Sequence, residues 1–148
     1  MLLQNKTAVI TGSNRGIGKA VLETFAENGA DIFACVRKES DEFSNVTARL
    51  SEKTGVSITP VYFDLAESEQ VKSGIKSILS SKKQIDILVN NAGVASGSFF
   101  QMTSLKDLKQ VFEINFFSQI LFTQGISRYM TRFKTGSIIN IASTAGLI

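Results

Sequence analysis

Apolar residues along this chain alternate between short runs rich in β-branched side chains and longer stretches in which they recur every three or four positions. Short runs of this kind are typical of buried strands, and the longer spacing is typical of amphipathic helices. The pattern predicts five strands, at 7–10, 31–36, 58–63, 85–89 and 137–141, and four helices, at 15–28, 41–53, 68–81 and 104–122. This alternation predicts an α/β fold in which a parallel sheet carries crossover helices on both faces.

The single proline and one glycine refine this picture. Pro60 lies inside the third predicted strand, where it removes one hydrogen-bond donor and favours the edge of the sheet. An edge position fits the strand order 3-2-1-4-5 of a doubly wound, Rossmann-type sheet. In the first helix, Ile17, Val21 and Phe25 recur at helical spacing and are expected to cover the sheet, with Gly29 ending the helix.

A glycine-rich turn follows the first predicted strand, at Thr11-Gly12-Ser13-Asn14-Arg15-Gly16-Ile17-Gly18. Gly12 permits a sharp turn, Gly16 leaves room for a pyrophosphate beside the backbone, and Gly18 allows the helix to pack closely on the sheet. The N–H groups of the first helical turn then face an anion. Glycines also mark turns that bind nothing, so it is the flanking strand and helix that make this motif predict a dinucleotide site.

The end of the second strand indicates which dinucleotide binds. A carboxylate there would accept hydrogen bonds from the free 2′-hydroxyl of NAD, but the chain carries Val36-Arg37-Lys38. Arg37 and Arg15 could instead flank a 2′-phosphate, so the sequence favours NADP over NAD. The alternative is that both arginines are only solvated surface residues.

Composition excludes several classes of protein. The 148 residues are 43% hydrophobic and 20% charged, with no long linker, and they predict one domain over 1–148 that lies in the cytoplasm and away from membranes. Histidine is absent and Cys35 is the single cysteine, so we expect neither a metal site nor a disulfide nor histidine-based catalysis. The net charge of +3 comes from scattered cations, and nucleic-acid binding is not expected.

Further motifs follow the later strands in order: Asp64-Leu65, Asn90-Asn91-Ala92-Gly93, Asn115 in the fourth helix, and Ser143. Together with the glycine turn they resemble the short-chain dehydrogenase/reductase family over essentially all 148 residues. Within the family the chain is most similar to the 3-oxoacyl-(acyl-carrier-protein) reductase group. The resemblance implies an oxidoreductase that transfers a hydride between NADPH and a carbonyl or alcohol substrate. A 3-oxoacyl thioester is the first candidate, ahead of a sugar, a steroid or another small ketone.

The resemblance also implies roles for individual residues. Asp64 would accept from the adenine amino group and Leu65 would contact the adenine ring. Ser143 would donate a hydrogen bond to the substrate carbonyl, and Asn115 would hold a water in a proton relay by distorting its helix. Alone, Ser143 could equally cap a short helix, Asn115 could be an exposed polar residue, and the Asn-Asn-Ala-Gly run could be an ordinary turn. The implied cofactor residues are Gly12, Ser13, Asn14, Arg15, Gly16, Ile17, Gly18, Arg37, Asp64, Leu65, Asn91, Ala92 and Gly93.

The chain departs from the family at its catalytic acid. The family's Tyr-x-x-x-Lys pair is expected shortly after Ser143, and the sequence stops at Ile148. Tyr62 lies in the third predicted strand, and Tyr129 precedes the fifth without a lysine four residues later, so neither fills the role. We therefore expect a fragment of a longer reductase that is inactive alone, or a natural truncation. A non-catalytic NAD(P)-binding sensor is the alternative function.

The fourth predicted helix indicates a partner. Ser104 is expected to cap it, with Asp107 as the acid of a capping box, and its apolar positions occupy more than one face. In the resembled family this helix pairs with a symmetry mate, so a homodimer or homotetramer through 105–122 is expected, unless the rest of the chain covers this surface. The segment 94–102, which contains Phe99 and Phe100, is expected to lie near the substrate.

Overall fold

Across the described residues, which are 1–95, 97 and 99–143, five parallel strands form one sheet in this computed structural model. The order β3-β2-β1-β4-β5 confirms the doubly wound arrangement predicted from the sequence. The strands are β1 (Thr7–Thr11), β2 (Asp31–Val36), β3 (Ile58–Tyr62), β4 (Ile87–Asn90) and β5 (Ser137–Asn140). The helices are α1 (Gly16–Glu27), α2 (Asp41–Thr54), α3 (Ser68–Ser80), α4 (Leu105–Phe112), the π-helix η2 (Glu113–Phe117), α5 (Ser118–Met130) and the 3-10 turns η1 (Phe100–Met102) and η3 (Thr131–Phe133).

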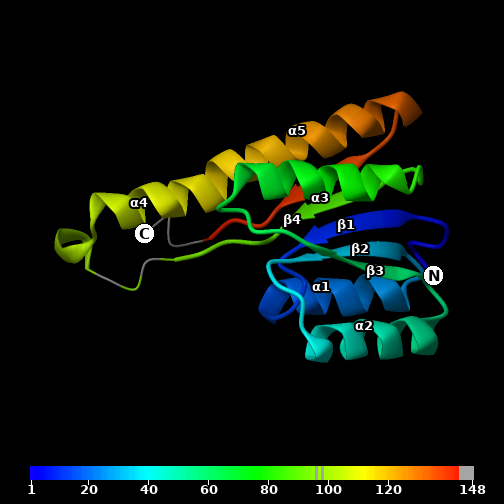
Figure 1. Ribbon diagram of the computed structural model, residues 1–148. Helices are drawn as coiled ribbons and strands as arrows, with labels where there is room; N and C mark the ends of the chain where they lie inside the picture. Colours follow the sequence, from blue (N-terminus) through cyan, green and yellow to red (C-terminus); the bar gives the residue numbers. More distant parts are fainter. Residues whose placement is uncertain (96, 98, 144–148) are drawn as a thin grey trace.

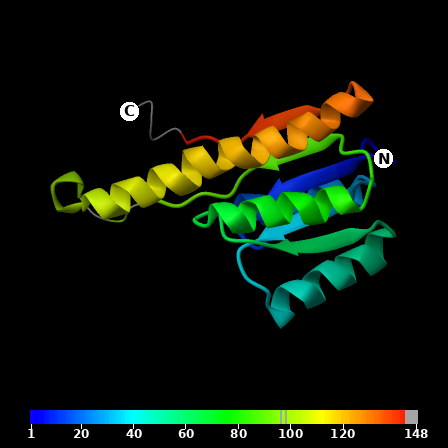
Figure 2. The same ribbon diagram turned by 45° about the horizontal axis from the view of Figure 1, so that its top comes forward.

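The helices cover both faces of the sheet, as predicted. In Figure 1, α1 and α2 lie on one face of the sheet and α3 and α5 lie on the other, and Figure 2 shows α3 and α5 side by side. Successive strand residues point to opposite faces, so Ile10 packs in one apolar cluster with Leu22 of α1, whereas its neighbour Val9 packs in a second cluster with Phe122 of α5. The central strands are therefore buried from both sides, which is typical of a parallel sheet.

Pro60 lies on an edge strand, as predicted, and the hydrogen bonds explain how the edge accommodates it. Ile32 N donates to Ser57 O at 2.8 Å and Phe63 N donates to Val36 O at 3.1 Å, so alternate residues of β3 face β2. Pro60 falls between them and has its nitrogen on the outer side of the sheet. The missing N–H therefore costs no ladder bond, and the outer edge of β3 offers one donor fewer to another strand.

The first helix buries a different face from the one predicted. Its buried residues are Gly18, Leu22 and Ala26. Ile17 is 60% exposed, and Val21 and Phe25 pack only at the margin of the cluster. The buried stripe therefore lies one position further along, and it begins at Gly18, whose lack of a side chain lets α1 lie close to Gly12 and Asn91.

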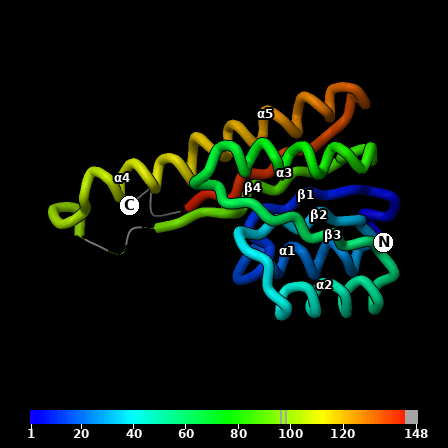
Figure 3. The backbone as a smooth tube through the Cα atoms, in the orientation of Figure 1, coloured from blue at the N-terminus to red at the C-terminus, as the bar shows by residue number. Residues whose placement is uncertain are grey.

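The fourth predicted helix is longer than expected and is interrupted. Ser104 caps it by accepting a hydrogen bond from Asp107 N at 3.1 Å, but the Asp107 carboxylate bonds to the Ser104 hydroxyl rather than to its backbone N–H. The helical rod continues past position 122 to the end of α5. Gly125 does not stop it, because the absence of a side chain there lets Ile75 of α3 approach closely. Figure 3 shows α4 and η1 projecting beyond the sheet. No described helix, this rod included, is both long and apolar enough to cross a membrane.

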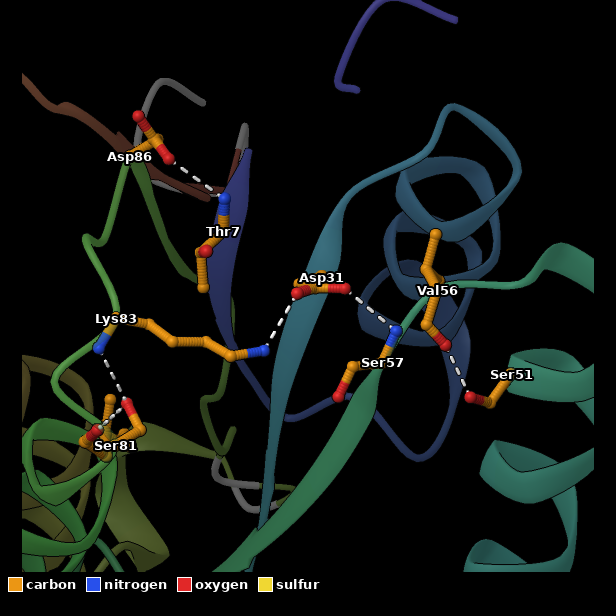
Figure 4. Close-up of polar contacts among 9 residues, drawn as sticks. Thr7, Asp31, Ser51, Val56, Ser57, Ser81, Lys83 and Asp86 are labelled. Atoms are coloured by element: carbon orange, nitrogen blue, oxygen red, sulfur yellow. Dashed lines mark hydrogen bonds and ion pairs between the residues drawn. The ribbon is translucent and has the colours of Figure 1, made fainter. Parts of the chain in front are cut away.

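Two aspartates hold the amino ends of the strands, at the opposite end of the sheet from the glycine turn (Figure 4). Asp86 accepts a hydrogen bond from Thr7 N at 3.0 Å, which helps to explain why β4 begins at Ile87 rather than at position 85 as predicted. Asp31 accepts from Ser57 N and from Lys83 Nζ, both at 2.8 Å. Burial alone would raise the pKa of both carboxyls, but these and other donors outweigh it, and each pKa lies below its usual value.

Candidate dinucleotide site

The carboxyl ends of β1, β2 and β4 and the loops that follow the first four strands enclose a cleft of about 800 Å³. A volume in this range is typical of small-molecule sites, and this end of a doubly wound sheet is where ligands bind. All the predicted cofactor residues except Ser13 and Gly18 line the cleft. The structure therefore brings together segments that lie as far apart as positions 12 and 93.

The glycine turn forms one wall of the cleft. Gly16 has a φ of 54°, which favours glycine, and no atom lies within 4 Å of the place that a Cβ would take. Gly18 is crowded instead: a Cβ there would lie 2.1 Å from Gly12 O and 2.4 Å from Asn91 Nδ2. The close approach that Gly18 permits is thus to the turn and to Asn91, rather than to the strands of the sheet as predicted.

The start of α1 is prepared for an anion. Within the described residues, its N-cap Arg15 makes no side-chain capping bond, and its first turn contains no acidic residue. By contrast, α2 and α4 are capped by Ser40 and Ser104 and carry acids in their first turns. The opening N–H groups of α1 are therefore left for an external acceptor, and the positive end of the helix dipole is not neutralised locally.

Ser13 supports this turn from the inside. It is fully buried, and its hydroxyl donates to Ile10 O at 2.8 Å. The side chain therefore points toward β1 and does not line the cleft. Contact between Ser13 and a cofactor stays a prediction, and the backbone of Ser13 would have to make that contact.

Thr11 and Asn91 join the glycine turn to the loop after β4. Thr11 Oγ1 accepts hydrogen bonds from Asn91 N and Ala92 N, each at 3.0 Å. In return, Asn91 Nδ2 donates to Thr11 O at 3.0 Å and to Gly12 O at 3.2 Å. The Asn-Asn-Ala-Gly segment is therefore not an isolated turn, because it is bonded across to β1 and forms one unit with the opposite wall.

The floor of the cleft below the loop after β3 is apolar, and its rim carries a carboxylate. Leu65 is buried, and Phe63, which stacks on Phe122 at 5.2 Å, also lines the cleft. Cys35 lies in the same floor, and burial raises the pKa of its thiol, so it stays neutral. Asp64 Oδ1 accepts from Ala66 N at 2.9 Å, which orients the carboxylate at the rim. An apolar floor beside an oriented acceptor suits a flat heterocycle with an amino group.

Unpaired charges gather where β2 ends. Arg15, Arg37 and Lys38 line the cleft, and in the part of the chain that the structure describes none of them forms an ion pair. Glu39 and Ser40 line the same wall. The cations are thus available to an anionic ligand, as predicted for the two arginines, whereas solvation alone would not require them to share one cleft.

Asn115 lies in the π-helix η2, so the predicted distortion of its helix is present. Its Oδ1 accepts from Val94 N at 2.9 Å, and its Nδ2 donates to Val94 O at 2.7 Å. One turn later, Gln119 Nε2 donates to Ala92 O at 2.7 Å. The side chain of Asn115 is therefore engaged with the loop after β4 and is not simply a solvated polar residue. Its role in a proton relay stays a prediction.

Comparison with known proteins decides the family, because the family described as short chain dehydrogenase matches residues 6–148. The chain belongs to the short-chain dehydrogenase family. It is 33% identical over 147 residues to the 3-oxoacyl-(acyl-carrier-protein) reductase FabG of Chlamydia trachomatis, and this alignment covers 99% of this chain and 58% of that protein. It is 33% identical over 144 residues to the corresponding reductase of Aquifex aeolicus, and that alignment covers 97% of this chain and 58% of that protein.

Solved structures agree with this assignment. L-sorbose reductase from Gluconobacter frateurii, complexed with NADPH and L-sorbose, superposes with a TM-score of 0.91 at 34% identity, over 98% of this chain and 55% of that one. The chain spans somewhat more than half the length of these short-chain dehydrogenases.

Some catalytic residues expected in a short-chain dehydrogenase are not gathered at the cleft. Ser143 is exposed beyond β5 and is not among the residues that line it. Tyr62 points its hydroxyl toward Ser44, at 3.4 Å, and Tyr129 is buried in α5, so neither described tyrosine lines the cleft. Residues 144–148 lie outside the described part of the chain.

Sequence reasoning missed several residues that line or hold the cleft. Lys38, Glu39 and Ser40 directly follow Arg37, so their place in the loop after β2 could have indicated them. Phe63 also had a signal, because it immediately precedes the Asp64-Leu65 motif. The hydroxyl of Thr11 had none, since its role depends on hydrogen bonds to residues 80 positions away.

Proposed function

We propose that this chain is the cofactor-binding part of an NADPH-dependent oxidoreductase, which transfers a hydride between NADPH and a carbonyl or alcohol substrate. The cleft carries this proposal: uncapped N–H groups at the start of α1 and unpaired cations at the end of β2 lie in one wall. The N–H groups suit a pyrophosphate and the cations suit a 2′-phosphate, and one dinucleotide carries both. The related L-sorbose reductase was solved with NADPH.

Each part of the cleft would bind a different part of the cofactor. The N–H groups that open α1 bind the pyrophosphate, and Arg15 and Arg37 bind the 2′-phosphate as charge-assisted donors. Asp64 accepts from the adenine amino group while Leu65 contacts the ring. The backbone from Asn91 to Gly93 admits the ribose next to the nicotinamide. When bound, the nicotinamide supplies or accepts the hydride.

The catalytic roles follow from the family. Ser143 donates a hydrogen bond to the carbonyl oxygen of the substrate, and the π-helix around Asn115 exposes backbone for the water of a proton relay. The tyrosine and lysine that complete the reaction in the family have no counterpart at the cleft among the described residues. The 148-residue chain alone is therefore expected to bind cofactor without turning over substrate.

A 3-oxoacyl thioester is the first substrate candidate, because the related proteins of Chlamydia trachomatis and Aquifex aeolicus are named as reductases of that class. A sugar is the second, since L-sorbose occupies the related structure. The segment 94–102 contains no charged residue, and Phe99 and Phe100 are about four-fifths exposed. Its Ser96, together with Ser98, lies outside the described residues.

A second copy of the chain is the proposed partner of the rod formed by α4, η2 and α5. Large apolar side chains along this rod remain between 45% and 67% exposed, although the sheet and α3 cover the other side of its α5 part, with residues such as Phe122 and Ile126 in the core. They are Leu105, Phe112, Phe116, Phe117 and Ile120. Apolar stripes of this kind mark interfaces, and an isologous pair of rods would cover both copies at once.

Calorimetric titration of the 148-residue chain with NADPH and NADH tests the cofactor. We expect NADPH to bind more tightly, by about three- to tenfold, because the 2′-phosphate adds charge-assisted contacts at an exposed wall. Equal affinities, or tighter binding of NADH, would contradict the preference. Failure to bind either cofactor at millimolar concentration would overturn the oxidoreductase proposal.

A non-catalytic, nucleotide-sensing role is the second candidate, favoured by the distance of Tyr62 and Tyr129 from the cleft lining. The two roles separate in an assay of NADPH oxidation with a panel of carbonyl compounds, using any longer natural product of the same gene. Oxidation that depends on a Tyr-x-x-x-Lys pair following Ser143 supports the enzyme. Tight NADPH binding without such a pair and without turnover supports the sensor.

A further inference from the structure

The wall that receives the 2′-phosphate in the proposed function also carries a carboxylate. Arg37 and Lys38 are followed at once by Glu39, and all three line the cleft with Arg15. An acid at the very end of β2 would indicate NAD in this fold, and that position is held by Val36. Glu39 lies three residues further on, outside the position at which an acid usually indicates NAD.

The charge of Glu39 is not neutralised by its neighbours. Glu39 is exposed, and throughout the described chain it forms no ion pair, although Arg37 and Lys38 lie within two positions of it. The first turn of α2, which begins just beyond, adds two more acids and no cation. The local field at this wall is therefore set by three cations together with Glu39, which lines the same cleft, and the two acids of α2 just beyond it, rather than by the cations alone.

We propose that Glu39 is a specificity-determining residue, which keeps the preference for NADPH over NADH as small as the roughly three- to tenfold expected above. The proposal rests on the proposed function. A carboxylate on this wall repels the dianionic 2′-phosphate within the Debye length, about 8 Å at physiological salt. NADH has no such phosphate, and its free ribose hydroxyls can donate to the same carboxylate.

The size of the effect follows from charge and exposure. A unit charge and a phosphate of nearly two charges, both solvated and several ångströms apart, interact by an amount on the order of the thermal energy. Removing the charge of Glu39 should lower the Kd of NADPH about two- to fivefold. The Kd of NADH should change by less than about twofold, because an amide oxygen can still accept from a hydroxyl.

The test compares Glu39→Gln with the matched control Glu52→Gln in the 148-residue chain. Both substitutions remove one exposed negative charge, but Glu52 lies near the other end of α2, about 15 Å of helix or more from the cleft. The Kd values of NADPH and NADH are measured calorimetrically for both variants and the unmodified chain, at 0.05 M and at 0.5 M salt.

Support requires that Glu39→Gln raise the ratio of the NADH Kd to the NADPH Kd about two- to fivefold at low salt. The gain should shrink at high salt, where the Debye length is about 4 Å, and Glu52→Gln should leave the ratio within about 1.5-fold. The proposal is overturned if the ratio is unchanged in Glu39→Gln, if it changes equally in both variants, or if it rises by the same factor at both salt concentrations. Each of these results leaves the proposed function intact. If neither cofactor binds the unmodified chain, both fall together.

Discussion

The hydroxyl of Thr11 offers a direct test of how the cleft is held together. Thr11 is 1% exposed, and its Oγ1 accepts the backbone N–H groups of Asn91 and Ala92, each at 3.0 Å. Thr11→Val keeps the shape of the side chain but removes its hydroxyl oxygen, which accepts these two hydrogen bonds. Two N–H groups that are partly buried then lose their partner.

The expected cost follows from those two groups. A buried N–H without an acceptor costs about 1–3 kcal/mol, and the lower half of that range applies because the loop after β4 is only half-buried. With about 1–2 kcal/mol for each of the two groups, Thr11→Val should therefore lower the free energy of unfolding by about 2–4 kcal/mol. Because Asn91 and Ala92 line the cleft, the variant should also bind NADPH at least about threefold more weakly under conditions in which it remains folded.

Thr47→Val is the matched control. Thr47 is 2% exposed, but its hydroxyl only donates, to Phe43 O and Ser44 O at 3.0 Å within α2. Removing this hydroxyl leaves no N–H group without an acceptor, so the free energy of unfolding should fall by less than about 1 kcal/mol. Urea unfolding of both variants measures the difference. If Thr11→Val costs no more than Thr47→Val, the hydroxyl does not hold the two walls together, and the account of the cleft as one unit is wrong.

Three further predictions concern the packing of Gly18, the carboxylate of Asp86 and the exposed ring of Phe116. Gly18→Ala should destabilise the chain by more than about 3 kcal/mol in thermal or urea unfolding, because its Cβ would meet backbone at 2.1 Å; a loss below 1 kcal/mol would contradict the close approach. Asp86→Asn should cost about 1–2 kcal/mol at pH 7. Since the folded pKa of Asp86 lies below its usual value, the stability it supplies is present above about pH 4 and disappears as the pH falls further, so unfolding curves of the variant and the unmodified chain should converge in acid. Phe116→Glu should reduce the mass measured by light scattering to that of one copy while NADPH still binds; an unchanged oligomer would exclude the rod as the interface.

The topology could be predicted because its determinants are local in sequence. Pro60 identified the edge strand through a missing donor, and the glycines at 29 and 55 ended helices within one or two residues of the predicted positions, both with a positive φ. Motifs at 64, 91 and 93 could be placed on one cleft because parallel strands present their carboxyl ends at one edge.

The features that sequence reasoning missed depend on contacts between distant segments. The distorted helix at Asn115 was expected from the family resemblance, but the two hydrogen bonds between Asn115 and Val94, 21 residues away, were not, because no helix propensity encodes that pairing. The predicted buried face of α1 was wrong because periodicity counts apolar side chains, whereas the buried stripe begins at Gly18, which has no side chain. The helix at 104–122 was predicted too short, because the apolar pattern does not show that α5 continues past Gly125, where Ile75 of α3 packs against the backbone.

The distribution of satisfied and unsatisfied groups separates the scaffold from the site more sharply than any motif does. At the amino ends of the strands, Asp86 accepts three hydrogen bonds and Asp31 accepts two, and each pairs with a lysine, so their charges are already used by the fold. At the carboxyl ends, α1 begins without a cap, and Arg37 has no partner in the described chain. Leaving polar groups unmatched gains nothing for stability, so their concentration at one end of the sheet is best explained by a ligand that completes them. An anion bound at the start of α1 should then stabilise the folded chain in proportion to the logarithm of its concentration, whatever chemistry the rest of the protein performs.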